Sequence, residues 1–208
     1  MHRYGWFAGI VAGLFAMASP IVAQGSAPIL GFKAGVTVAT AELGDLDETF
    51  DKDNRTGLNA GVFLLLGSNN VLSLQPELNL VTRGFKYSGV SDGDVSLGYL
   101  QPAVLLKFGI PLVVVKPGVF AGVGYGFKTT CSLDETECDD PDVDFGVKSS
   151  DFTGIFGADV QLGIGETLIL IGDARYEVGF SDIDDANDVF SDMKNRAFTI
   201  QVGLGLRT

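Results

Sequence analysis

Residues 72–80 read LSLQPELNL, and this stretch decides the fold. Leucine or proline stands at every even position, and the odd positions hold Ser73, Gln75, Glu77 and Asn79. Successive side chains of a β-strand point to opposite sides, so a period of two predicts a strand with one apolar and one polar face. A helix would repeat its apolar residues at every third or fourth position instead.

The same alternation recurs along the chain. We predict eight strands, over residues 30–41, 56–66, 71–85, 96–108, 113–127, 151–162, 168–180 and 195–206. Their connections alternate between long acidic loops, the longest at residues 42–55 and 128–150, and short turns at residues 67–70, 109–111 and 163–167. Long outer loops and short periplasmic turns are typical of small outer-membrane barrels. The sequence therefore predicts an all-β fold, an eight-stranded antiparallel up-and-down transmembrane β-barrel.

The N-terminus has the features of an export signal. Arg3 is followed by an apolar segment over residues 6–17 and by small residues that end at Ala23. This pattern predicts a cleaved signal peptide at residues 1–23 and one domain over residues 24–208. A cut after Ala27 and an uncleaved membrane anchor are the alternatives, although the apolar run is short for a membrane span.

The charge and the histidine content exclude several functions. The formal net charge is −12, and loss of Arg3 with the signal makes it −13. Such a charge argues against nucleic acid as a partner and favours cations or basic partners. The single histidine, His2, lies within the predicted signal, so the mature chain lacks the base of Ser-His and Cys-His catalysis. We expect a protein that is not an enzyme.

The polar faces of the strands carry charges of both signs among glycines. A narrow barrel interior is just wide enough for side chains to fill it, so paired charges and small residues suit such a lumen. We predict a network of lumen charges formed by Glu77, Arg83, Lys107, Lys116, Asp159, Asp173, Arg175 and Glu177. Two roles stay open for it, a polar plug and a narrow ion path. A soluble, lipocalin-like periplasmic barrel is the alternative fold.

The loops suggest two further features. Cys131 and Cys138 are the only cysteines, and an even count in an exported chain predicts one disulfide between them. The four loops, counted with Asp151, hold 21 of the 26 acids, which predicts either a solvated acidic crown or binding of Ca²⁺ or Mg²⁺. The candidate metal ligands are Asp140, Asp142, Asp144 and Asp151, which have the spacing of ligands in a calcium-binding loop. Phe145 stands where such a loop has a glycine. No other cofactor is expected.

Several segments in order resemble a known family. They are residues 74–78 (LQPEL), 99–108 (YLQPAVLLKF), 116–122 (KPGVFAG), 151–158 (DFTGIFGA) and 174–180 (ARYEVGF). Together they are similar to the outer-membrane β-barrel domain often labelled "porin family protein". The resemblance implies an eight-stranded barrel like that of outer membrane proteins A and X, and it supplies no catalytic residues.

These observations converge on a role at the cell surface. We expect a monomer in the outer membrane of a Gram-negative-type bacterium, inserted by the barrel-assembly machinery and surrounded by outer-membrane lipids. Its expected role is structural, a plugged barrel that displays acidic loops to surface partners; a narrow pore for ions or small solutes is the alternative. Aromatic residues expected at the membrane interfaces are Tyr87, Tyr99, Tyr125, Tyr176 and Phe180, with Tyr99 in the lumen-side register.

Overall fold

A computed structural model describes residues 27–43, 51–88, 93–110, 112, 114–133, 136–137, 150–180 and 193–208. Within these residues the chain forms nine strands: β1 Ile29–Leu43, β2 Asp51–Leu65, β3 Leu72–Ser88, β4 Gly93–Gly109, β5 Val115–Leu133, β6 Thr136–Glu137, β7 Ser150–Ile164, β8 Leu168–Gly179 and β9 Met193–Arg207. The predicted signal peptide lies outside the described residues. No helix in this part of the chain is long and apolar enough to cross a membrane.

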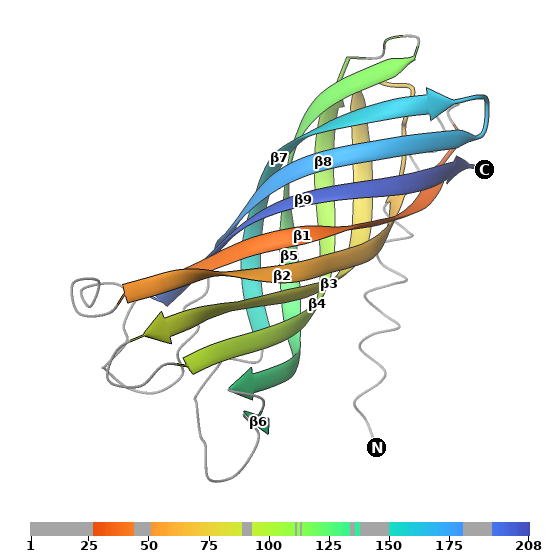
Figure 1. The fold of residues 1–208 in the computed structure, drawn as a ribbon. Helices are drawn as coiled ribbons and strands as arrows, with labels where there is room; N and C mark the ends of the chain where they lie inside the picture. Colours follow the sequence, from red (N-terminus) through yellow and green to blue (C-terminus); the bar gives the residue numbers. More distant parts are fainter. Residues whose placement is uncertain are drawn as a thin grey trace, which may run out of the picture.

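The eight long strands close into one antiparallel barrel (Figure 1). Each pairs with its neighbours in the chain, apart from the short β6, and the circle closes where β1 meets β9. β6 only extends the outer end of β5 as a hairpin. The eight-stranded up-and-down barrel predicted from the alternation is confirmed.

The strands are staggered as they go round the barrel. The printed pairs lead from Gly109 in β4 through β5, β7, β8, β9, β1, β2 and β3 and return to β4 at Tyr99. The circuit therefore closes with a displacement of ten residues along β4. A stagger of this kind tilts the strands against the barrel axis and decides which inward residues meet across the lumen.

The two ends of the barrel differ. Short connections join β2 to β3, β4 to β5 and β7 to β8 at one end, which we call the turn end (upper right in Figure 1). Gly67 and Gly165 have φ angles of 73° and 65° there, a backbone conformation that glycine adopts without a steric penalty. The strand ends that border the longer connections lie at the opposite end, which we call the loop end.

The strands extend further toward the loop end than predicted. β2 begins at Asp51 instead of residue 56, and β5 continues to Leu133 instead of residue 127. Their register places Lys86 of β3 between Asp53 of β2 and Asp94 of β4. Residues assigned to loops because they are acidic therefore belong partly to strands, because the backbone ladder does not require apolar side chains to continue.

The two faces of the wall are sharply separated. Outward residues of the central wall are mostly apolar and exposed, among them Leu78, Leu80, Leu106, Val119, Ile200 and Val202. Inward residues are buried, and they include most of the described charges. Tyr125, Tyr176 and Phe180 point outward as expected of interface residues, whereas Tyr99 is buried in the lumen and the side chain of Tyr87 lies outside the described part.

Inward glycines make room for large side chains on neighbouring strands. A Cβ atom added to Gly157 of β7 would lie 2.4 Å from the ring of Phe120 and 2.4 Å from the backbone oxygen of Ala174. Gly31 leaves room for Phe63 and Gly205 leaves room for Ile29 in the same way. The glycines on the polar faces of the strands therefore provide the space that a few bulky inward side chains occupy.

We predict that Gly157→Ala destabilises the barrel and that Gly172→Ala does not. The first substitution overpacks the lumen wall, with an expected cost of about 1–3 kcal/mol, whereas a Cβ atom at Gly172 meets nothing within 4 Å. Both replace an in-strand glycine by the same residue. Urea unfolding in detergent micelles, followed by far-ultraviolet circular dichroism, measures the difference; equal midpoints for the two variants would contradict this packing.

Candidate functional site: the charged lumen

Glu77 of β3 is the centre of the charged lumen. Arg175 of β8 donates to both of its carboxylate oxygens, with Nη1 at 2.9 Å from Oε2 and Nη2 at 3.3 Å from Oε1. Lys33 of β1 forms an ion pair with Oε1. Two neighbours on β3 complete the shell, because Gln75 donates to Oε1 at 2.6 Å and Asn79 donates to Oε2 at 3.0 Å.

Asp173 of β8 is the second anion of this cluster. The Nε and Nη2 atoms of Arg175 each donate to one of its oxygens at 3.0 Å. The ammonium of Lys33 lies 3.2 Å from its Oδ2. Two anions and two cations therefore share one buried cluster, in which bidentate guanidinium contacts fix the geometry.

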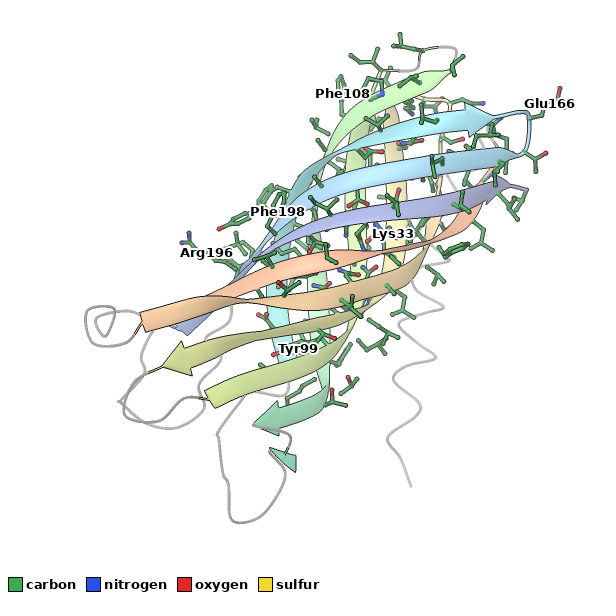
Figure 2. All side chains as sticks on the ribbon, in the orientation of Figure 1. Lys33, Tyr99, Phe108, Glu166, Arg196 and Phe198 are labelled. Atoms are coloured by element: carbon green, nitrogen blue, oxygen red, sulfur yellow. The ribbon has the colours of Figure 1, made fainter. Side chains whose placement is uncertain are left out.

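The cluster crosses the lumen. β2 separates β1 from β3, and β9 separates β1 from β8, so the contacts among Lys33, Glu77 and Arg175 run through the interior instead of along the wall. Figure 2 shows Lys33 midway along the barrel, whereas Phe198 points out of the wall and Glu166 lies at the turn end. All four charged groups are at least 95% buried, which requires each charge to have a close partner of opposite sign.

A second ion pair lies toward the turn end. Lys107 of β4 is 2.9 Å from Oδ2 of Asp159 in β7, and Gln161 donates to the same oxygen at 2.9 Å. Lys107 also donates to Gln75 at 3.0 Å, and Gln75 in turn contacts Glu77. Gln75 thus joins the two ion clusters into one network that includes residues of β1, β3, β4, β7 and β8.

Aromatic and aliphatic side chains pack around the charges. Phe120 lies beneath two cations, with Lys107 Nζ 5.5 Å and Arg175 Cζ 5.4 Å from its ring centre. Its other neighbours are the buried residues Ala103, Leu105 and Ile155. Cation–π contacts are stronger in a desolvated site such as this one.

Further buried polar contacts lie nearer the loop end of the lumen. Gln101 of β4 donates to Thr153 at 2.9 Å and to Glu177 at 3.2 Å. The hydroxyls of Thr37 and Thr199 are 2.8 Å apart across the closure of the barrel.

Two buried amides have no protein partner among the described residues. Both polar atoms of Asn59 and both of Gln201 lack a hydrogen bond. They flank Gly35 of β1 in one row, Asn59 on β2 and Gln201 on β9. Buried amides seldom remain unsatisfied, so this row is where internal water would bind.

The lumen residues predicted from the sequence lie at different levels of the barrel. Glu77, Asp173 and Arg175 meet in the central cluster, and Lys107 and Asp159 meet in the second pair. Glu177 lies apart from them near the loop end, and Lys116 lies at the turn end. Arg83 belongs to β3, but its side chain lies outside the described part of the chain.

Lys33 is the central residue that the sequence-based prediction of the network omits. Its position on the polar face of the first strand was a sufficient signal for an inward side chain. Sequence spacing gave no indication that it meets Glu77, 44 residues away in the chain, because that contact depends on the stagger of the barrel.

The predicted loop sites lie largely beyond the described residues. Asp140, Asp142, Asp144 and Cys138 are outside them, and Cys131 contributes only its backbone position in β5. Asp151 begins the inward face of β7 and is buried. Within the described ranges, no group of three or more His, Cys, Asp or Glu side chains is placed to hold a metal ion.

Comparison with known proteins agrees with this architecture. Residues 9–205 match the family model "Outer membrane protein beta-barrel domain", and the chain belongs to this family. It is therefore an outer-membrane β-barrel protein, and the family places it in the outer membrane of Gram-negative bacteria. No curated protein sequence matches the chain.

Two solved structures share the fold. The outer membrane protein OprG from Pseudomonas aeruginosa has a TM-score of 0.56 at 12% identity, over 87% of this chain and 95% of that one. Neisserial surface protein A also has a TM-score of 0.56 at 12% identity, over 87% of this chain and 97% of that one. At this level of identity the likeness concerns the fold alone.

We predict that Glu77→Gln strongly lowers the stability of the folded barrel. The substitution leaves Lys33 and Arg175 close together with only Asp173 to balance them, and removing one partner from a buried ion cluster costs about 3–5 kcal/mol. The midpoint temperature of heat-modifiable gel migration measures the loss. Glu166→Gln, the same change in an exposed turn residue, is the control and should leave the midpoint unchanged. A Glu77→Gln midpoint equal to that of the wild type would show that the network contributes nothing.

Proposed function

We propose that this protein is a structural and surface-interaction barrel of the outer membrane, whose lumen is closed to ions and whose loop end displays acidic segments. The single observation that carries the proposal is the ion cluster of Lys33, Glu77, Asp173 and Arg175, whose contacts join β1, β3 and β8 through the interior. An ion that passed this point would have to separate charges already in contact.

The packing around the cluster supports closure as well. Phe120 and Leu105 occupy the space on one side of the central charges, and Phe63 and Ile171 belong to a second buried apolar group. Eight strands enclose an interior that side chains are able to fill. A lumen with both apolar and paired ionic contents offers no continuous polar route for a hydrated ion.

The distribution of acids supports a role at the loop end. By sequence, most of the acids fall in the segments that connect or prolong the strands there. In an outer-membrane barrel the longer connections face the outside of the cell. This crown of carboxylates suits cationic partners, including divalent cations that bridge it to anionic lipid headgroups. In this proposal the protein acts as a monomer, and it binds partners without catalysing a reaction.

A second candidate function is a narrow path for water or small ions. The unpartnered amides of Asn59 and Gln201, which lie in one row on either side of Gly35, favour it because they would be hydrated. Such a path would still have to continue past Glu77 and Arg175. For that reason we prefer the closed barrel.

Conductance in planar lipid bilayers distinguishes the two functions. We expect the purified, folded protein to give no sustained openings, because the ion cluster and its apolar neighbours fill the lumen. Heat-modifiable migration of the same sample establishes that the protein is folded. Sustained openings from folded monomers, absent from bilayers that received detergent alone, would overturn the closed barrel in favour of the narrow path.

A further inference from the structure

The turn end contains a cavity that is separate from the central ion cluster. Its volume is about 350 Å³, and its lining includes Ser68, Lys116, Gln161 and Arg207 together with the apolar residues Leu112 and Val114. These residues come from the connection between β2 and β3, the connection between β4 and β5, and the strands β5, β7 and β9. A cavity of this size that has a few convergent polar groups is typical of a small-molecule site.

Lys116 supplies one positive charge to the cavity. It is 8% exposed, and its Nζ atom donates to the backbone oxygens of Ser68 and Asn70, each at 2.7 Å. An ammonium group has three N–H donors, so one donor has no acceptor among the described residues. On the neighbouring strand, Oδ2 of Asp159 contacts Lys107 and Gln161, whereas its Oδ1 has no hydrogen-bond partner among the described residues, and its negative charge acts on Lys116.

Arg207 supplies the second positive charge. Its Nη1 atom donates to the backbone oxygen of Glu166 at 3.2 Å, and its Nε atom is buried without a hydrogen-bond partner. Among the described residues that line the cavity there is no aspartate or glutamate. Lys116 and Arg207 therefore both line one space that has no carboxylate among its described lining residues, an arrangement that favours a bound anion.

The surroundings of the cavity indicate which anion. Phe108 and Ile110 are exposed on the outer surface at this end, and Leu112 and Val114 are both exposed and part of the cavity lining. Lys116 and Gln161 are buried on the inward face, so the cavity lies at the mouth of the lumen, and Leu112 and Val114 form its exposed rim. In an outer-membrane barrel an apolar rim of this kind lies beside the headgroups of the turn-side leaflet. The anionic group available at that depth is the phosphate of a phospholipid.

We propose that the turn-end cavity is a phosphate-binding site, in which Lys116 and Arg207 donate to the oxygens of an anionic phospholipid headgroup from the turn-side leaflet. The guanidinium contributes planar, directional donors, and the ammonium contributes a point charge. Ser68 and Gln161 supply further polar contacts at the wall. The site does not depend on whether the lumen conducts ions.

Nuclear magnetic resonance of the full chain in dodecyl maltoside micelles tests the proposal. One arm adds phosphatidylglycerol to the micelles, a second adds inorganic phosphate, and a third adds sodium chloride at matched ionic strength to correct for screening. We expect saturable shifts of the backbone amides of Ser68, Asn70 and Glu166 with phosphatidylglycerol and no such shifts with sodium chloride.

Substitutions then assign the site. Lys116→Gln and Arg207→Gln should each weaken phosphatidylglycerol binding about tenfold, the effect of losing one charge-assisted hydrogen bond. Lys128→Gln, at the loop end of the same strand as Lys116, should leave the affinity unchanged. Saturation by inorganic phosphate but not by phosphatidylglycerol would overturn the lipid assignment. Absence of saturable shifts in the wild-type protein, or equal weakening by Lys128→Gln, would overturn the site itself.

Discussion

Buried charge inside a closed cylinder is the constraint on which the structure depends. Glu77 lies between Lys33 and Arg175, and Asp173 balances the remaining charge. These groups are at least 95% buried, so each needs partners of opposite charge within the barrel. Since the partners come from β1, β3 and β8, the cluster also favours the particular stagger that brings those strands into contact.

The outward face follows a different requirement. In the hydrocarbon layer a backbone group without a partner is costly, and a closed sheet satisfies all of them without an edge. Side chains on that face only have to be apolar, which the exposed leucines, valines and isoleucines achieve. Each strand therefore has one face toward the lipid and one toward the lumen, and the alternation of its residues suits both environments.

Most of the fold could be predicted from the sequence because a period of two is a local property. It identifies the strands of residues 72–80 and their neighbours, and it assigns Glu77 and Arg175 to the same interior. It does not reveal which interior residues touch, because the ten-residue stagger is a property of the closed sheet. The alternation places Lys33 on the inward face, but its contact with Glu77 follows only from this stagger.

Two other features could not be predicted from local patterns in the sequence. β2 extends back to Asp51 because its backbone pairs with β3. The acidic composition of that segment indicates a loop instead, so composition alone is misleading there. The turn-end cavity joins Lys116 to Arg207, residues separated by most of the second half of the chain. Both follow from the way strand ends meet once the barrel has closed.

The central claim is that successive residues of one strand point alternately toward the lipid and toward the barrel interior. Leu105 and Leu106 of β4 provide the most direct test, since their exposed fractions are 0% and 52%. Nuclear Overhauser contacts between micelle acyl chains and leucine methyl groups measure the difference. The account predicts acyl-chain contacts for Leu106 and, for Leu105, contacts only with inward neighbours such as Phe120 and Ile155. Acyl-chain contacts of similar strength at both leucines would contradict it.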